Sequence, residues 1–279
     1  MQKLNPRVKV KVLTTDIRLE DPKYFTQYDV IIATDLDYPS LFSLNTAARV
    51  AQRPFYAAGA HGFYGFIFAD LIKHEYVIER EQSNRPTQLV RESATRSIIS
   101  ATTKKEGGKT VEMVTKSETY TPINLANTSP LPPDMIRDRR KMRRVTPLLT
   151  CIRALWEYQQ RSGGPNPTIS AHADLAAFTT LAQEKHSELQ LPSETLKSDF
   201  LRSFLQNLGS EIAPVTAFLG GQLAQDVINV LGKREQPIQN LMLFDAEETL
   251  GVIYSLHPLF EDGPVLEGPA AGNVPVVEL

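Results

Sequence analysis

The chain has 279 residues, of which 42% are hydrophobic, a share that excludes bulk disorder. Its 30 Lys and Arg against 32 Asp and Glu give a net charge of −2, so no overall positive field would hold nucleic acid. Cys151 is the only cysteine, which excludes an intrachain disulfide and fits a reducing compartment. No apolar run reaches the roughly 18 residues of a membrane span, and the N-terminus lacks the pattern of a secretory signal. We therefore expect a soluble, intracellular protein with no nucleic-acid and no membrane partner.

The first segments of the chain predict a β-α-β unit. Residues 8–13 alternate apolar and polar side chains, which predicts a half-buried strand. Residues 28–33 form a continuous apolar run, which favours a parallel strand covered on both faces. Leucines and alanines at spacings of three and four predict a helix over 40–53, which Pro54 ends. A third strand over 54–58 completes an order that is typical of a parallel α/β sheet.

A glycine-rich turn follows this unit. Gly59, Gly62 and Gly65 are spaced somewhat like a dinucleotide-binding loop, but they lie between two predicted strands and open no helix. We therefore interpret them as a turn in which backbones approach closely. The aromatic segment 64–71 predicts the strand after the turn. Residues 1–76 together predict the parallel α/β part of the molecule.

The middle of the chain has a different composition. Residues 77–121 are rich in Thr, Ser, Lys and Glu, and alternation over 97–103 and 110–115 predicts a small antiparallel β insertion with a turn at residues 107–108. Four prolines within residues 122–133 predict a linker. The insertion has few apolar residues, so we expect little core of its own.

Residues 134–258 predict a helical region followed by strands that return to the sheet. Thr146 and Pro147 together form a helix start, with threonine as N-cap and proline at the first helical position. The predicted helices span residues 134–144, 146–161, 170–187, 193–207 and 214–231, and the predicted strands span 241–245 and 251–256. Residues 259–279, rich in proline and glycine, predict a disordered tail.

Few residues have the chemistry of an active site. The sequence contains neither a GxGxxG dinucleotide loop nor a GxxxxGK[ST] phosphate loop. Cys151 lies at an apolar helical position, where cysteine is usually a small buried hydrophobe and not a nucleophile. The histidines form neither an i,i+4 pair nor an HExxH motif, so we predict no metal site. Asp35 and Asp37 follow a predicted strand at the end where α/β sheets bind ligands, but turn formation explains them equally well.

Two other features have more than one interpretation. Residues 137–144 hold six basic side chains, which is typical of a solvated helix face but also of a nuclear-import or partner-binding patch. Gly220 and Gly221 lie inside a predicted helix, where each glycine costs roughly 1 kcal/mol relative to alanine. Close packing against another backbone would offset this cost, either in the core or across a subunit interface.

Four stretches of the sequence resemble a known family in the same order. They are KLNPRVKVKV, YFTQYDVIIAT, AAGAHGFYGFIFADLIKHEYVIE and EIAPVTAFLGGQLAQDVINVLGKREQPIQNLMLFD. They resemble the smaller, non-catalytic subunits of heterodimeric SUMO-activating enzymes, which belong to the ThiF/MoeB superfamily. The resemblance extends to residue 258 and is weakest in the β insertion and the linker. Its most specific part is the last stretch, with Pro214, Gly220, Gly221 and Gln225.

The resemblance implies an α/β fold, namely an incomplete ThiF/MoeB-like, Rossmann-related adenylation fold with a small β insertion and a helical region. It implies no catalytic residue and no cofactor in this chain. The partner, the larger catalytic subunit, would bind MgATP, adenylate the C-terminus of SUMO and form a thioester with it. The smaller subunit would act as a scaffold and would meet SUMO through the complex. The family pattern begins with an arginine-containing helix and a glycine-rich turn, which we expect to be missing from the sequence as given.

The resemblance also implies a contact surface with the larger subunit. We place this surface on the glycine-rich turn and the glycine-containing helix, with the candidate residues Gly59, His61, Gly62, Gly65, Pro214, Gly220, Gly221 and Gln225. The implied location is the nucleus, and also the cytoplasm. Two alternatives remain: an N-terminally truncated form that regulates the enzyme by competing for the partner, and a nucleotide-dependent oxidoreductase. The missing phosphate loop disfavours the oxidoreductase.

Overall fold

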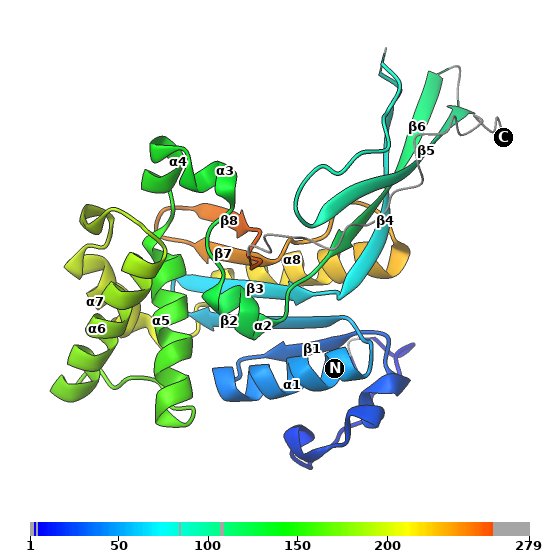
Figure 1. Ribbon diagram of the computed structural model, residues 1–279. Helices are drawn as coiled ribbons and strands as arrows, with labels where there is room; N and C mark the ends of the chain where they lie inside the picture. The colour runs from blue at the N-terminus through cyan, green and yellow to red at the C-terminus, as the bar shows by residue number, and fades with distance from the viewer. Residues whose placement is uncertain (1–2, 4, 84, 107–108, 259–279) are drawn as a thin grey trace.

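The computed structural model describes residues 3, 5–83, 85–106 and 109–258, and Figure 1 shows its arrangement. The predicted tail over 259–279 and the predicted turn at residues 107–108 lie outside these residues. A central sheet with helices on both faces forms the body, and a smaller sheet projects from it (Figure 1). The α/β fold class is therefore confirmed. None of the helices in the described ranges is long and apolar enough to cross a bilayer.

The central sheet has five strands in the order β1-β2-β3-β7-β8. Their bounds are β1 Ile31–Thr34, β2 Phe55–His61, β3 Tyr64–Asp70, β7 Leu241–Asp245 and β8 Leu250–Tyr254. Helix α1 (Tyr38–Val50) connects β1 to β2, which pair in parallel, so the predicted β-α-β unit is confirmed. The other pairs, β2–β3, β3–β7 and β7–β8, are antiparallel. Parallel pairing in this sheet is thus limited to β1 and β2, whereas the prediction made residues 1–76 as a whole a parallel α/β part.

Two predictions for the N-terminal part are wrong. Residues 8–13 form no strand, and Val8, Val10 and Val12 are exposed, because no neighbouring strand is there to pair with them in the described part of the chain. Strand β1 is not covered on both faces, since Ile32 is 47% exposed. The continuous apolar run over residues 28–33 therefore did not predict correctly how far this edge strand is buried.

The β insertion is confirmed as a separate antiparallel sheet. It consists of β4 (Lys73–Glu81), β5 (Arg96–Glu106) and β6 (Lys109–Thr119) in the order β4-β6-β5. The sequence did not predict β4, which starts before the composition changes at residue 77. Tyr76 and Val114 are fully buried in this sheet, although most of its other side chains have some exposure.

The region between the two sheets and the helices is not a simple linker. Helix α2 (Ile123–Thr128) lies within the segment 122–133, and Ile123, Ala126 and Leu131 of this segment are buried in the core. The prediction of a linker was wrong because the prolines indicated an irregular backbone, whereas the apolar residues between them pack. The backbone N–H of Ile123 donates to the side-chain oxygen of Asn45 at 2.9 Å, which attaches α2 to α1.

The helical region is largely as predicted. Its helices are α3 Pro133–Ile136, α4 Arg139–Arg143, α5 Pro147–Ser162, α6 His172–Glu188, α7 Ser198–Asn207 and α8 Ala213–Gly232. Thr146 is the N-cap of α5, as predicted, and its hydroxyl accepts from the Leu148 backbone N–H. The prediction over 134–144 corresponds to two short helices, α3 and α4, because α3 ends with Arg137 as its C-cap and Asp138 caps the start of α4. The predicted helix over 193–207 is a short 3-10 helix (Ser193–Thr195) followed by α7.

The helices cover the two faces of the central sheet unequally. One core lies between the sheet and α1, α2 and α5, and a second, smaller core lies under α8 on the opposite face (Figure 1). Strand β3 contributes to both, because Phe66 and Phe68 point to the first core whereas Ile67 and Ala69 point to the second. Among the described residues, α8 is therefore the one helix that covers the second face.

Candidate partner interface

Helix α8 packs one face against the central sheet. Its buried residues lie at helical spacing: Val215, Leu219, Leu223, Asp226 and Val230. The carboxylate of Asp226 accepts from the Tyr56 hydroxyl at 2.7 Å and from the Ile238 backbone N–H at 3.0 Å. Burial raises the pKa of Asp226 above its usual value, an effect that these two hydrogen bonds oppose. These contacts fix the rotation of α8, so its other side faces away from the sheet.

The outer side of α8 is exposed and carries no charge. Asp226 is the only charged residue among the 20 of this helix, and it is buried. Phe218, Ile228 and Leu231 are 41%, 64% and 58% exposed. A helix in contact with water usually presents charged side chains, and exposed apolar surface is typical of a protein contact site. We define the α8 face as these three residues together with the exposed Ala213, Pro214, Ala217, Gly220, Gly221, Gln222, Ala224, Gln225 and Gly232.

Gly220 and Gly221 lie on the α8 face, with open space beside them. Beyond the neighbouring turns of α8, a Cβ atom added at either position would meet no atom of the described residues within 4 Å. Packing inside this chain therefore does not explain them, although each costs roughly 1 kcal/mol of helix propensity. Of the two interpretations that the sequence left open, the structure favours a close approach by another molecule.

The central sheet extends beyond α8 on both sides. Ile32 of β1 pairs with Tyr56, and Ile253 of β8 pairs with Met242. Tyr56 and Met242 belong to the core under α8, so both isoleucines lie on that side of the sheet, where they are 47% and 53% exposed. Phe218 also joins helix and sheet, because its ring stacks on Phe244 of β7 with centroids 4.2 Å apart. An apolar surface broader than the helix thus lies open on this side.

The other predicted contact residues pack within the chain. Gly62 has a φ of +60° in the turn between β2 and β3, and its N–H donates to the Ser210 carbonyl at 2.8 Å. A Cβ atom on Gly65 would collide with Leu219 of α8, and one on Gly59 would collide with the ring of Phe66. These three glycines therefore allow close packing of the β2–β3 hairpin on itself and on its own helices. The structure does not bring them to the α8 face.

His61 is likewise a core residue. Its ring is 9% exposed and lies against the rings of Phe66 and Phe204, and its Nδ1 atom has no hydrogen-bond partner in the part of the chain that the structure describes. Desolvation lowers the pKa of His61 to about 4, and the nearby Asp35 only partly opposes the shift. The imidazole is therefore neutral at pH 7 in the folded chain.

His61 makes a testable contribution to the pH dependence of stability. Because its folded pKa lies below its unfolded value of 6.5, the unfolded chain binds more protons between these values, and stability falls as the pH decreases through this window. We expect a loss of roughly 2–3 kcal/mol from this residue between pH 7 and pH 4. His61→Phe, which keeps an aromatic ring at the site, is expected to remove that part of the slope in urea unfolding curves. Parallel curves for the two proteins would contradict this assignment.

A cleft of about 470 Å³ adjoins the α8 face near the start of β7. Carboxamide side chains dominate its walls, from Gln222, Gln225, Asn229, Gln236 and Gln239, and Ile253 of β8 also lines it. Gln225 is thus the predicted site residue that belongs to both the cleft and the α8 face.

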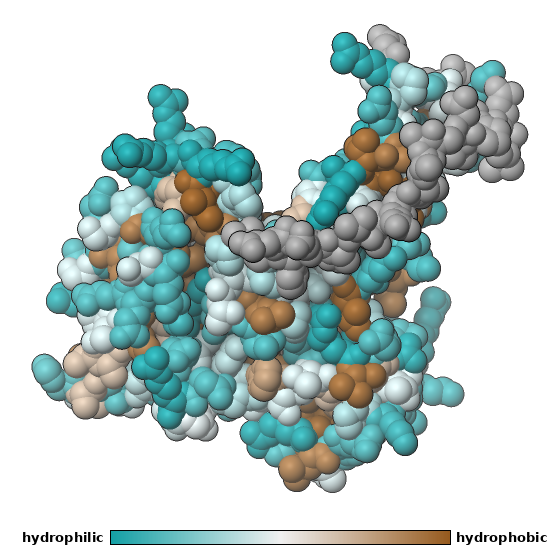
Figure 2. Space-filling view, viewed as in Figure 1, coloured by the Kyte–Doolittle hydropathy of each residue, from teal (hydrophilic) through white to brown (hydrophobic). Residues whose placement is uncertain are grey.

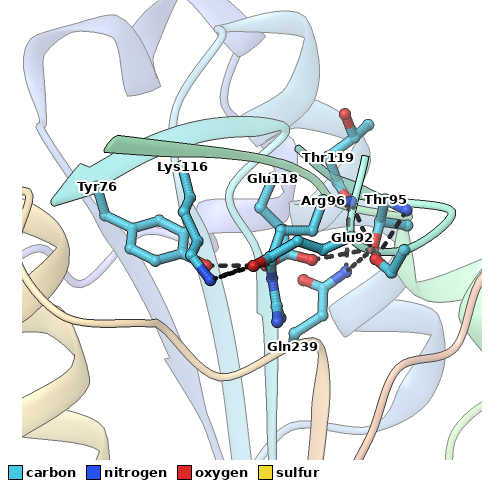
Figure 3. A network of polar contacts seen from close by, with 9 residues as sticks. Tyr76, Glu92, Thr95, Arg96, Lys116, Glu118, Thr119 and Gln239 are labelled. Atoms are coloured by element: carbon cyan, nitrogen blue, oxygen red, sulfur yellow. Dashed lines mark hydrogen bonds and ion pairs between the residues drawn. The ribbon is translucent and has the colours of Figure 1, made fainter. Parts of the chain in front are cut away.

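A polar network forms one end of this cleft (Figure 3). The fully buried Glu118 of β6 accepts from Arg96 Nε at 2.7 Å and from the Thr95 hydroxyl at 2.9 Å. The Gln239 amide donates to the same hydroxyl and to the Thr119 carbonyl, both at 3.3 Å. Gln239 precedes β7, whereas the other residues belong to the inserted sheet or its loop. The network therefore ties the inserted sheet to the central one beside the α8 face.

The carboxyl end of β1 does not fit a nucleotide phosphate. Asp35 adopts a φ of 57°, and the carboxylate of Asp37 accepts from the Ser40 backbone N–H at 2.9 Å as the N-cap of α1. A phosphate at this helix start would meet a carboxylate instead of free N–H groups, and residues 34–40 contain no glycine. Of the two interpretations of these aspartates, turn formation is the one that the geometry favours. Within the described residues, no group of three or more His, Cys, Asp and Glu could hold a metal ion.

Several residues of the surface were not found from the sequence. Phe218, Ile228 and Leu231 belong to a segment that was noted only as an apolar helix, and its lack of charge was the signal that could have identified them. The exposure of Ile32 and Ile253 depends on how far the sheet extends beyond the helix, which no local pattern encodes.

Comparisons with known proteins agree with this architecture. The model described as "ThiF family" matches residues 1–257. The chain is 34% identical over 265 residues to "DNA damage tolerance protein RHC31" of Saccharomyces cerevisiae, an alignment that covers 94% of this chain and 72% of the relative. It is 27% identical to "DNA damage tolerance protein rad31" of Schizosaccharomyces pombe (92% and 70% covered) and 26% identical to "SUMO-activating enzyme subunit 1" of Homo sapiens (92% and 71% covered). The match over nearly its whole length means that this chain belongs to the ThiF family.

Proposed function

We propose that this chain is the smaller, non-catalytic subunit of a heterodimeric SUMO-activating enzyme. The observation that carries the proposal is the uncharged α8 face beside a half-covered sheet, because a second folded domain is the kind of partner that would cover it. The similarity to human "SUMO-activating enzyme subunit 1" supports the enzyme class.

In this proposal the larger subunit is the partner, and it supplies the chemistry. It binds MgATP, adenylates the C-terminus of SUMO and forms the thioester. The present chain presents the α8 face to that subunit and contacts SUMO only through the complex. The proposed location is the nucleus and the cytoplasm.

The two alternative functions have less support. An oxidoreductase would need a phosphate-binding loop, and the Asp37 carboxylate occupies the helix start where the phosphate would bind. The names of the three relatives given above denote neither an oxidoreductase nor a competing regulator.

Reconstitution tests the proposal directly. The full chain is mixed with the larger subunit of a SUMO-activating enzyme, and complex formation is followed by size-exclusion chromatography and SUMO thioester formation by non-reducing gels. We expect a one-to-one complex, with thioester formation that depends on both proteins and on MgATP. Failure to form the complex, or equal thioester formation without this chain, would contradict the proposal.

Cys151 provides a second test. It is fully buried in α5, and burial raises the pKa of its thiol far above the usual value, so the reactive thiolate is not available. Cys151→Ala is expected to leave SUMO transfer by the assembled enzyme within about twofold of the wild type, since only packing changes. Loss of transfer in a correctly assembled complex would show that this cysteine has a chemical role.

A further inference from the structure

We propose that an arginine cluster on α4 and at its two ends docks an acidic polypeptide segment of a partner protein. The cluster consists of Arg137, Arg139, Arg140, Arg143 and Arg144, all exposed. Hydrophilic side chains cover α3 and α4 at the upper left of Figure 2. Met135, Ile136 and Met142 of these helices pack into the core on the α5 side of the sheet, so the cluster is separate from the α8 face. The proposal does not depend on the proposed function.

The backbone that carries the arginines is fixed. Met142, Val145 and Leu131 are 6%, 3% and 1% exposed and hold the segment to the core from within and from both ends. The side chain of Asp138 accepts from the backbone N–H groups of Arg140 and Lys141, which starts α4. A partner that binds here does not need to order the backbone, so less conformational entropy is lost on binding.

The guanidinium groups of the cluster are free to bind an external anion. In the described ranges none of the five has a carboxylate or hydrogen-bond partner, whereas the neighbouring Lys141 pairs with Asp134 at 2.8 Å. The whole chain has a net charge of −2, so this positive charge is local and not part of a general basic field. Guanidinium binds carboxylates with two parallel hydrogen bonds, which favours a run of Asp and Glu as the ligand.

The structure also favours an acidic segment over two other ligands of a basic surface, namely a receptor for extended basic segments and a nucleic acid. A receptor that reads basic residues along an extended strand would need α3 and α4 to unfold, and Met142 and Val145 to leave the core. Nucleic-acid surfaces usually combine a wider basic field with exposed aromatic rings for stacking. Residues 133–145 contain no aromatic residue. A carboxylate-rich segment is the ligand that fits a small, fixed patch whose unpaired cations are all arginines.

Two triple variants of the full chain provide a matched test. Arg139→Gln/Arg140→Gln/Arg143→Gln removes three charges from the cluster, and Arg7→Gln/Lys9→Gln/Lys11→Gln removes three from another exposed segment. The probes are a labelled peptide of alternating Glu and Ala and a single-stranded oligonucleotide of the same charge, followed by fluorescence anisotropy at about 0.15 M salt. Thermal melts establish that both variants are folded.

We expect the peptide to bind the wild-type chain, with Kd raised at least about tenfold in the cluster variant and by less than about twofold in the control. Arg→Lys at the same three positions keeps the charge but is expected to weaken binding severalfold, because an ammonium cannot form the paired hydrogen bonds. No measurable peptide binding, equal losses in both triple variants, or tighter binding of the oligonucleotide than of the peptide would each overturn the proposal.

Discussion

Gly221→Leu is expected to weaken binding of the larger subunit by about 1–3 kcal/mol, or roughly five- to 150-fold in Kd, while the free chain becomes at least as stable as before because leucine has a higher helix propensity than glycine. The leucine side chain would fill the space through which the partner backbone approaches. Apart from the adjacent turns of the helix itself, none of the described residues has an atom within 4 Å of a Cβ at this position, so no tertiary contact among them is disturbed. Calorimetric titration with the larger subunit and urea unfolding of the free variant measure the two quantities.

Gly221→Ala sharpens this test, because its two effects have opposite signs. Alanine stabilises the helix of the free chain by about 0.5–1 kcal/mol, yet its methyl group still obstructs a close approach. Ala176→Leu, which adds bulk at an exposed position on α6, is the control and is expected to leave partner binding unchanged. Unchanged affinity of Gly221→Leu together with lower stability of the free chain would instead place Gly221 in intrachain packing.

Glu118→Ala is expected to destabilise the chain by about 3 kcal/mol, as measured by urea unfolding. The substitution leaves the Arg96 guanidinium without its carboxylate at 2.7 Å, and that side chain is only 20% exposed. It also removes the acceptor for the Thr95 hydroxyl, which positions Gln239 at the end of the cleft (Figure 3). We therefore expect the inserted sheet to lose its attachment to the central sheet first.

A solvent-exposed ion pair provides the control for this prediction. Lys141 and Asp134 pair at 2.8 Å, but their side chains are 48% and 69% exposed, so Asp134→Ala is expected to cost less than about 1 kcal/mol. Replacing the buried pair together, as Arg96→Met/Glu118→Leu, is expected to recover much of the lost stability, because no unpaired charge remains. Equal effects of Asp134→Ala and Glu118→Ala would show that burial does not set the strength of these pairs.

Elements with complete local signals were predicted correctly from the sequence. Helix α5 has threonine at its N-cap, proline at its first position and Gly163 in a left-handed conformation after its end, so its bounds follow from neighbouring residues. Residues 8–13 show the limit of such signals. Alternation describes which side chains could face a core, whereas a strand also needs a neighbour to receive its hydrogen bonds. Helix α2 was missed because its attachment to Asn45 joins residues far apart in the sequence.

The candidate surface could be predicted only in part, for a related reason. Gly220 and Gly221 were recognisable because glycine inside a helix has a known cost that demands an explanation. Gly62 and Gly65 were also predicted to contact the partner, but the residues beside them, Ser210 and Leu219, come from distant parts of the same chain. Sequence shows where the backbone requires a small residue, and only the fold shows which molecule occupies the space beside it.

The half-covered side of the central sheet also bears on how a cell handles this protein. Ile32, Phe218, Ile228 and Ile253 are exposed together on a freshly made chain, and chaperones and proteases recognise such apolar surface. Copies made in excess of the larger subunit would be retained or degraded until a partner covers them. We therefore expect the abundance of this chain to follow that of its partner, so that depleting the partner shortens the lifetime of the protein while its messenger RNA stays constant.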